Sequence, residues 1–295
     1  RRVPPNTPRQ PTSGAQVAKI IADLGLTPVM AVELEFYLVD RERTAEGCAQ
    51  PPRQPLSGRR EFRTQINSMA DLNEYSTLLA GIDVAARAQA LPAGTVLAEY
   101  GPGQFEVNLR HVPDALTACD HAIRLKRLVR GVALQHGMEA TFMSKPYRDH
   151  AGSGAHLHVS LVDSSGRNVF AAEDAAGSEM LRHAIGGLAA TIDATMAVCA
   201  PTANSYRRFR PEAYVPLTPS WAINNRGVAF RIPHGPPASR RVEHRVAVQG
   251  QLAERPRERG TALALHREHR TRDLHRPLVV EDAVAGAQLP VRDAL

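Results

Sequence analysis

A glycine turn that runs directly into a strictly alternating segment is the feature that most constrains the fold of this chain. Residues 152–161 read Gly-Ser-Gly-Ala-His-Leu-His-Val-Ser-Leu. Successive side chains of a β-strand point to opposite faces, so His156, His158 and Ser160 share one face and the apolar residues between them share the other. The segment therefore predicts a strand with one polar face and one packed face.

Four further stretches show the same alternation. They are residues 32–36 with Glu33 and Glu35, residues 104–109 with Gln104, Glu106 and Asn108, residues 230–232 with Arg231, and residues 241–246 with Arg241, Glu243 and Arg245. A single strand of this kind usually has a solvated outer face. These stretches together carry Glu, His and Arg, which bind hard cations and anions, rather than Lys, Thr and Ser. We expect a sheet that packs on one face and binds something on the other.

Helical periodicity lies between these strands. We expect helices over residues 15–24, 70–91 and 178–198, and a long helix that Asp114 caps and Gly137 ends, with an apolar stripe that includes Leu116, Ile123, Leu128 and Val132. Residues 41–60 are rich in Pro, Gly and Arg and predict a mobile loop, and residues 204–211 predict a second loop. Strands and helices together predict an α+β fold in which helices back the sheet.

Composition excludes several classes of function. The net charge of +6 comes almost entirely from Arg, since Lys occurs only at positions 19, 126 and 145. Without a basic stripe interleaved with aromatic residues, we expect no nucleic-acid partner. Three widely spaced cysteines indicate neither a zinc knuckle nor a disulfide framework, and we expect Cys119 and Cys199 in the core. With no membrane-length apolar run and no signal-like segment, we expect a cytoplasmic protein without a membrane partner.

The two ends of the chain lack these patterns. Residues 1–14 are rich in Pro, Arg and Thr and are expected to be irregular. Residues 248–295 mix Arg, Glu, His, Pro and Ala without a sustained helical or strand period. We expect this tail to be disordered or to result from a shifted reading frame.

The polar positions form a ligand set dominated by carboxylate oxygen. Its members are Glu33, Glu35, Glu99, Glu106, Glu243 and His156. Such a set suits Mg²⁺ or Mn²⁺ better than a structural zinc ion. The alternative is that the acids pair with Arg231, Arg241 and Arg245 and hold no metal. Divalent ions beside arginines suit phosphoryl transfer. No phosphate-binding glycine loop is found, so a nucleotide would be held by the sheet face.

Several motifs resemble, in order, those of the glutamine synthetase family and most closely its γ-glutamylpolyamine synthetase branch. They are Glu-x-Glu-Phe-Tyr-Leu at 33–38, Pro-Gly-Gln-Phe-Glu at 102–106, Thr-Phe-Met-x-Lys-Pro at 141–146, Gly-Ser-Gly-x-His-x-His at 152–158, Asn-Ser-Tyr-Arg-Arg at 204–208, Asn-Arg at 225–226 and Arg-Val-Glu-His-Arg at 241–245. The resemblance implies a glutamine synthetase-like catalytic domain over residues 15–247, with an antiparallel sheet, a polar active-site face and helices behind it.

The resemblance also implies a role for each polar residue. One metal ion would be held by Glu35, Glu99 and Glu106, and a second by Glu33, His156 and Glu243. The nucleotide would lie near His158 and Ser160, and its phosphates would face Arg226, Arg231 and Arg241. Glutamate would be bound by Gly152, Arg208 and Arg245. Arg226 and Tyr214 would be the catalytic residues. The implied reaction is an ATP- and Mg²⁺-dependent ligation of glutamate to an amine through a γ-glutamyl phosphate, in a ring-shaped homo-oligomer.

The chain departs from the family pattern in ways that bear on its activity. Tyr214 stands where ammonia-using synthetases have a catalytic Glu, and Ala151 replaces an Asn before the glycine turn. Tyr214 favours a polyamine or alkylamine acceptor, with an ammonia-using glutamine synthetase as the alternative. The resemblance implies an N-terminal β-grasp domain before the catalytic domain, and we expect this chain to lack it. An inactive remnant that binds metal or nucleotide is therefore a further alternative.

Overall fold

The computed structural model describes residues 19, 21–211 and 213–246. The chain divides into two units, residues 1–251 and 252–295, and all that follows concerns the described part of the first. The predicted irregular segment 1–14 and the tail 248–295 lie outside the described residues. Of the predicted helix 15–24, Lys19 and residues 21–23 are helical, and Gly25 follows with a φ of 71°.

Eight strands of the described residues form one sheet. They are β1 (Thr27–Asp40), β2 (Ala93–Ala98), β3 (Gln104–Leu109), β4 (Met138–Thr141), β5 (Ala155–Val162), β6 (Trp221–Ile223), β7 (Phe230–Ile232) and β8 (Val242–His244). Their order is β2-β3-β1-β5-β8-β7-β6, and β4 also pairs with β1. The pairings are antiparallel except for β6 with β7, so the sheet is mixed at one edge. The five predicted strands are present, whereas β2, β4 and β6 were not predicted.

The register across the sheet places the polar residues on one face. Glu35 of β1 lies opposite Glu106 of β3, and Glu33 lies opposite His156 of β5. Farther along, β5 places His158 opposite Glu243 of β8. Directly paired residues of neighbouring strands share a face, so the polar side chains of four strands come together as predicted.

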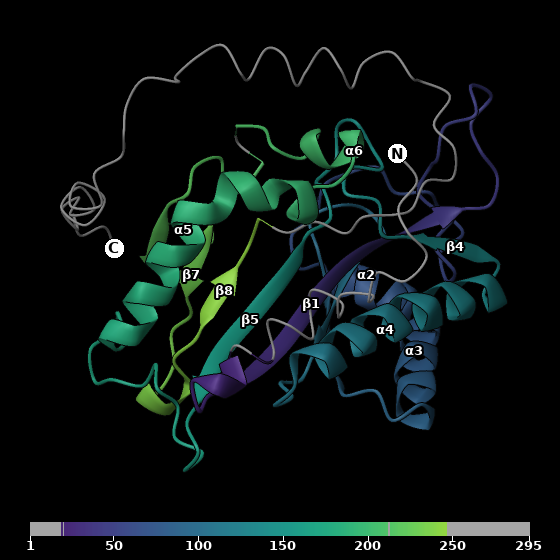
Figure 1. Ribbon diagram of the computed structural model, residues 1–295. Coiled ribbons are helices and arrows are strands. Elements are labelled where there is room, and N and C mark those ends of the chain that lie inside the picture. The colour runs from purple at the N-terminus through teal and green to yellow at the C-terminus, as the bar shows by residue number, and fades with distance from the viewer. Residues whose placement is uncertain (1–18, 20, 212, 247–295) are drawn as a thin grey trace, which may run out of the picture. The chain divides into compact units, whose positions relative to one another are not determined.

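Helices α3 (Ser76–Ala88), α4 (Ala115–Gln135) and α5 (Glu179–Cys199) pack against the other face of the sheet (Figure 1). The described residues also form the short helices α2 (Met69–Glu74) and α6 (Ala203–Tyr206) and a 3₁₀ turn η1 at Pro237–Ser239. One core cluster joins α3 and α4 to β1 and β3, and a second joins α5 to β7 and β8. Leu157 packs on the first cluster and Val159 on the second, so both helix groups cover the same sheet face. No helix of the described residues is long and apolar enough to span a bilayer.

The predictions for residues 70–91 and 204–211 need correction. The predicted helix 70–91 is two helices, α2 and α3, that meet at the fully buried Tyr75, whose ring packs edge-on against Phe105 at 5.4 Å. Tertiary packing of this aromatic ring overrides an otherwise continuous helical pattern. Residues 204–211 are not entirely a loop, because Thr202 caps the single helical turn α6.

The apolar stripe of α4 was only partly predicted. Leu128 and Val132 are buried, but Leu116 and Ile123 are exposed, because the face toward the sheet is the one that contains Leu125 and Val129. The predicted cap is present, since the Asp114 side chain accepts a hydrogen bond from the Leu116 amide.

The prediction for the cysteines was wrong in one case. Cys119 is exposed, because it lies on α4 away from the face that packs on the sheet, and Cys199 is only half-buried. Residues 41–60 carry no helix and a single bridge between Arg53 and Arg60. Arg60 also pairs with Asp40 at 2.8 Å, which ties the end of this loop to the end of β1.

We expect Gly101→Ala to lower the free energy of unfolding by about 1 to 3 kcal/mol. A Cβ at Gly101 would overlap the hydroxyl of Tyr37, which is fully buried and donates a hydrogen bond to the Ala151 carbonyl at 2.8 Å. The control is Gly131→Ala in α4, where a Cβ meets nothing within 4 Å. That substitution should raise the free energy of unfolding by about 0.5 to 1 kcal/mol. Urea denaturation compares the two, and an equal loss in both would contradict the close approach at Gly101.

Candidate active site

Glu33 lies at the centre of the polar face. One carboxylate oxygen is 2.9 Å from Nδ1 of His156, and the other is 2.7 Å from Nε2 of His158. Burial alone would raise the pKa of this carboxyl, but the hydrogen bonds from both histidines hold the pKa of Glu33 well below its usual range. The central acid is therefore ionised at neutral pH.

The imidazole of His158 is fixed in one tautomer. Arg241 Nε donates to His158 Nδ1 at 3.0 Å. An arginine nitrogen can only donate, so Nδ1 accepts and Nε2 carries the proton that faces Glu33. Two hydrogen bonds thus link Arg241 to His158 and His158 to Glu33.

The glycine turn before β5 is bound to the second acid of β1. Glu35 accepts hydrogen bonds from the Gly154 amide at 2.9 Å and from Gln104 Nε2 at 3.3 Å. The same Gln104 nitrogen donates to the Gly152 carbonyl at 3.2 Å. A Cβ at Gly152 would lie 2.7 Å from Cγ of Arg208, so only glycine lets this arginine approach the turn.

Arg208 follows α6 and is buried. Its Nε and Nη1 atoms are buried without a hydrogen-bond partner. A buried guanidinium without partners is unfavourable, and its planar fork matches a carboxylate. The glutamate-binding role that the resemblance implies for Arg208 stays a prediction. Arg245, predicted for the same role, instead uses its Nε to donate to the Arg226 carbonyl at 3.1 Å and its Nη1 to bind Glu243.

Glu243 is the member of the cluster that arginines neutralise. It is fully buried and pairs with Arg231 and Arg245. Burial favours its neutral form, but His156, Arg245 and the other nearby positive groups lower its pKa. The alternative of arginine-paired acids therefore describes Glu243, whereas Glu33 pairs with histidines.

Glu99 and Glu106 are crowded by other acids. Burial, reinforced by the charges of Glu33, Glu35 and Glu99, raises the pKa of Glu106 to about 9. Burial and the charge of Glu35 raise the pKa of Glu99 to about 7. Acids that are held protonated by their neighbours become ionised when a cation is placed among them.

The donor atoms are close enough to hold metal ions. Two sets have ligand atoms within 4.8 Å of one another, namely Glu33 with His158 and Glu243, and Glu33 with Glu106 and His156. His156 Nε2 is buried without a hydrogen-bond partner and lies 3.8 Å from Glu35. The oxygen-rich donors, the crowded charge and this unused nitrogen fit Mg²⁺ or Mn²⁺. These two sets differ from the two ligand triads that the resemblance implies. The assignment of the acids to those triads stays a prediction.

The remaining predicted residues lie around this cluster. Ser160 is half-buried opposite Val29, near the start of β1. Arg226 is exposed, and its charge acts on Glu99. Tyr214 is exposed, has a φ of 52°, and packs its ring 5.3 Å from that of Tyr100.

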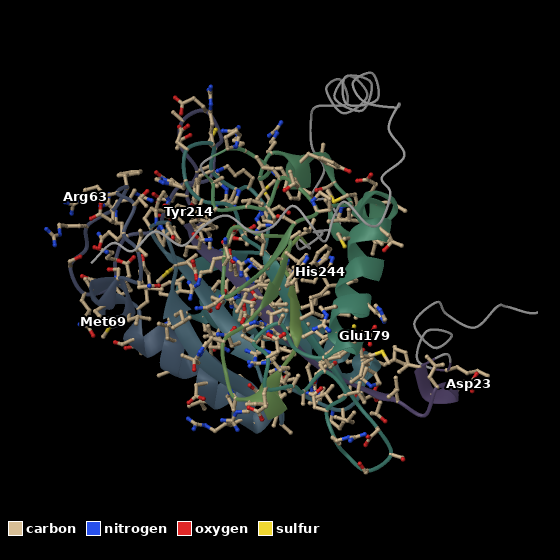
Figure 2. The ribbon with its side chains drawn as sticks, turned by 90° about the vertical axis from the view of Figure 1, so that its left-hand side faces the viewer. Asp23, Arg63, Met69, Glu179, Tyr214 and His244 are labelled. Atoms are coloured by element: carbon tan, nitrogen blue, oxygen red, sulfur yellow. The ribbon has the colours of Figure 1, made fainter. Side chains whose placement is uncertain are left out.

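Two neighbours of the site were missed by sequence reasoning. Tyr100 follows Glu99 directly, and its carbonyl accepts from the Gln65 amide at 3.1 Å. In Figure 2, Tyr214 accordingly lies toward the 61–69 segment that carries Arg63 and Met69, and away from Glu179. His111 places its ring 6.0 Å from that of His158, beyond the end of β3 where the alternation had stopped.

We expect Glu106→Gln to stabilise the metal-free chain more at pH 8 than at pH 5. The pKa of Glu106 is raised from 4.5 to about 9, so the folded state keeps a proton that the unfolded state has lost. Stability from this group is therefore complete below pH 4.5 and is lost as the pH rises toward 9. Removing the group should give a difference on the order of 1 to 3 kcal/mol between the two pH values.

The measurement is urea denaturation in EDTA at both pH values. The control is Glu173→Gln, because Glu173 is an exposed acid in the loop before α5. It should change stability equally at the two pH values. A gain from Glu106→Gln that is the same at pH 5 and pH 8 would show that the folded state does not raise the pKa of Glu106.

Comparison with known proteins places this geometry in a family. The family described as "Glutamine synthetase, catalytic domain" matches residues 6–249. The chain is 49% identical over 223 residues to the γ-glutamylputrescine synthetase PuuA of Escherichia coli, covering 76% of this chain and 47% of that protein. It is 38% identical over 227 residues to glutamate–isopropylamine ligase of a Pseudomonas species, covering 76% and 48%. Thus the chain spans about half the length of the curated relatives it matches.

Solved structures agree with the sequence match. A complex of GmaS with ADP superposes with a TM-score of 0.68 at 27% identity, over 79% of this chain and 53% of that one. Plasmodium falciparum glutamine synthetase, at 20% identity, shares the fold with a TM-score of 0.70 over 79% and 50%. The sheet with its acidic face and the matched sequence lead to one conclusion: the chain belongs to the glutamine synthetase family.

Proposed function

We propose that this chain is the catalytic portion of an ATP-dependent ligase that joins the γ-carboxylate of glutamate to a polyamine or another primary alkylamine. The observation that carries the proposal is a cluster of acids and histidines beside a buried arginine whose Nε and Nη1 lack partners. Acids suited to a divalent cation and an arginine suited to a carboxylate are what glutamate activation by ATP requires. PuuA and the isopropylamine ligase, by their names, join glutamate to amines.

The acidic cluster would hold Mg²⁺ or Mn²⁺. Its members would be Glu33, Glu35, Glu99, Glu106, His156 and Glu243. The bound ions would supply positive charge to the phosphate oxygens. Glu106 would give up its proton on loading, since its raised pKa reflects burial together with the negative charges nearby.

The chain's own cations would orient the two anionic substrates. Arg208 would bind a carboxylate of glutamate beside the glycine turn, because its side chain lies against that turn and its Nε and Nη1 have no hydrogen-bond partner. Arg231 and Arg241, from β7 and the start of β8, would contact the phosphates of ATP, with Arg226 nearby. His158 would fix the position of Arg241 relative to Glu33, because it is hydrogen-bonded to both.

The reaction would then proceed in two displacements. An oxygen of the γ-carboxylate attacks the terminal phosphorus of ATP, and the bond to ADP breaks. The amine nitrogen next attacks the carbonyl carbon of the acyl phosphate, phosphate leaves, and the nitrogen loses a proton. Guanidinium groups stabilise the charge that develops on the transferred phosphoryl group. The complete protein is expected to work as a homo-oligomer.

The acceptor follows from Tyr214 and Tyr100. Their ring centroids are 5.3 Å apart, Tyr100 follows Glu99 in the sequence, and Tyr214 is largely exposed. A tyrosine at this position lacks the negative charge with which a carboxylate attracts ammonium. Aromatic faces instead pack against methylene groups and attract an alkylammonium head. This geometry favours an alkylamine or polyamine over ammonia.

The experiment that tests the function replaces the segment of E. coli PuuA aligned with this chain by the chain's own residues. Phosphate release from ATP and glutamate is measured with putrescine, spermidine, ethanolamine and ammonia. The proposal requires turnover with a preference for the alkylamines. A preference for ammonia would refute the acceptor assignment. Retained binding of ATP without turnover for any amine would indicate an inactive remnant.

We expect Tyr214→Glu in this chimera to raise kcat/KM for ammonia relative to putrescine by about tenfold, because a carboxylate attracts the small cation and accepts its proton. The control is Tyr206→Glu, an exposed tyrosine whose ring packs on Phe209. It should leave the ratio unchanged. An unchanged ratio in Tyr214→Glu would remove Tyr214 from the acceptor site.

We expect Glu33→Gln to weaken Mn²⁺ binding to the 295-residue chain by at least roughly tenfold, because both candidate metal sets share this carboxylate. The matched control is Glu139→Gln, since Glu139 is a half-exposed acid that pairs with Arg43. Isothermal titration calorimetry measures both. Equal affinity in the two variants would show that Glu33 is not a ligand.

A further inference from the structure

Lys126 of α4 is half-buried over an aromatic ring. Its Nζ atom lies 5.4 Å from the centroid of the Phe142 ring. That ring is fully buried and packs on Phe36 of β1, with the two centroids 5.4 Å apart. Because the ring is fixed in the core, the lysine side chain that covers it is held in one place. The amine therefore lies at the boundary between the core and solvent.

Arg130 shares this ring with Lys126. Its Cζ atom also lies 5.4 Å from the Phe142 centroid. Residues four positions apart on a helix are neighbours, and like charges at this spacing repel one another. A guanidinium keeps its proton in proteins, whereas a buried lysine can lose one. The repulsion therefore acts on the protonation of Lys126.

No acid compensates this repulsion. Among the described residues, no carboxylate forms an ion pair with Lys126, and Glu33 and Glu35 point to the opposite face of the sheet. The acids on the elements that pack against α4 already have arginine partners. These pairs are Glu139 of β4 with Arg43, Asp83 of α3 with Arg87, and Asp40 of β1 with Arg60.

The other two lysines of the chain have different surroundings. Lys19 is exposed and pairs with Asp23 at 3.0 Å. Lys145 donates a hydrogen bond to the His150 carbonyl. Lys126 thus differs from both, because its nearest described polar neighbour is another cation.

These surroundings favour the neutral amine of Lys126. Burial, reinforced by the charge of Arg130, lowers the pKa of Lys126 to about 8. About half of the amines are then neutral at pH 8, against less than about 1% for a lysine of ordinary pKa. A desolvated lysine beside another cation is an activated nucleophile.

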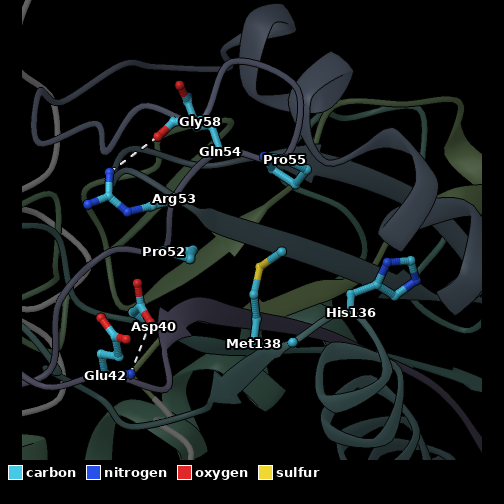
Figure 3. Close-up of a pocket in the computed structure, with 10 residues that line it drawn as sticks. Asp40, Glu42, Pro52, Arg53, Gln54, Pro55, Gly58, His136 and Met138 are labelled. Carbon is cyan, nitrogen blue, oxygen red and sulfur yellow. Dashed lines mark hydrogen bonds between the residues drawn. The ribbon is translucent and has the colours of Figure 1, made fainter.

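The cavity at the C-terminal end of α4 offers no such nucleophile (Figure 3). It measures about 460 Å³ and is lined by residues that include Asp40, Arg53 and His136. Its polar groups bind one another: Arg53 donates to the Gly58 carbonyl at 3.4 Å, and Asp40 accepts from the Glu42 amide at 2.9 Å. Among the described residues, no lysine or cysteine lines this cavity.

We propose that Lys126 is a site of covalent acylation by acyl phosphates, with its amine as the nucleophile and Arg130 as the group that binds the departing phosphate. The neutral amine attacks the carbonyl carbon, and an N–C bond forms. The bond from that carbon to the phosphate oxygen breaks, and phosphate leaves with the electron pair. The nitrogen gives its proton to water, and the product is an uncharged amide.

Arg130 selects the class of acyl donor. A guanidinium binds phosphate oxygens through charge-assisted hydrogen bonds, and Arg130 has no acid partner among the described residues. An acyl phosphate places a reactive carbonyl next to such an anion. It can therefore contact Arg130 with its phosphate while its carbonyl carbon meets the neighbouring amine.

The test incubates the 295-residue chain with acetyl phosphate at pH 7.5, and mass spectrometry of peptides measures acetylation at each lysine. We expect Lys126 to react about tenfold faster than Lys19. Its rate should level off above about pH 8. In the urea-unfolded chain the two lysines should react equally. Equal or faster acetylation of Lys19 in the folded chain, or a preference for Lys126 that persists in urea, overturns the proposal.

Variants of α4 provide the second readout. Arg130→Gln should slow acetylation of Lys126 by at least about fivefold, because it removes both the like charge and the phosphate contact. The control is Arg127→Gln, an exposed arginine next to Lys126, which should leave the rate unchanged. Equal rates in the two variants overturn the proposal.

A donor without a phosphate separates the two effects of Arg130. With phenyl acetate, which is uncharged, Arg130→Gln should slow acetylation less than it does with acetyl phosphate. An equal effect with both donors would show that Arg130 does not bind the phosphate, which overturns the assignment of acyl phosphates. None of these readouts depends on the ligase reaction, so failure here leaves the proposed function intact.

Discussion

The gathering of carboxylates on one face of the central strand is the constraint on which the rest of the structure depends. Glu33 and Glu35 project from the middle of β1, which pairs with β3, β4 and β5. Acids so close together in a buried setting repel one another, as the raised pKa of Glu106 shows. The sheet can hold these acids only because hydrogen bonds or positive charges stabilise them. Histidines bind Glu33, an amide and a glutamine bind Glu35, and arginines bind Glu243.

The packed face of the sheet holds the strands at this spacing. Phe36 and Leu38 of β1 are fully buried between the sheet and the helices α3 and α4, and Ile232 of β7 is buried near α5. Because side chains alternate, each apolar residue buried on one face fixes the position of a polar neighbour on the other. A register slip of one residue would turn Phe36 toward the acids and Glu35 into the core. The apolar packing therefore specifies the geometry of the polar face.

Alternation was a strong enough signal to predict the face shared by Glu33, His156 and Glu243, because that periodicity is a property of the strand itself. The edge and short strands β2, β4 and β6 gave no such signal, since neighbouring strands, more than their own pattern, determine their pairing. The exposed side of α4 was misjudged for a related reason. Several apolar stripes are possible on its surface, and only the sheet selects one.

Contacts between loops were beyond sequence reasoning altogether. Tyr100 and Tyr214 are more than a hundred residues apart, and the family motifs give no reason to pair them. Arg208 could be assigned to glutamate only by resemblance. Its missing partners, and the glycines that allow its approach, become visible only when the 152–154 turn and α6 are placed together.

The coexistence of protonated and ionised acids links cation binding to pH. Glu33 is ionised at neutral pH, whereas Glu106, with a pKa of about 9, keeps its proton in the metal-free cluster. In the proposed metal site, a cation that entered beside Glu33 would therefore meet one ligand ready to bind and another that must first release a proton. Proton release and cation binding would become a single equilibrium, in which higher pH favours the loaded state. The repulsion between the carboxylates of the metal-free face would therefore favour binding of the cation.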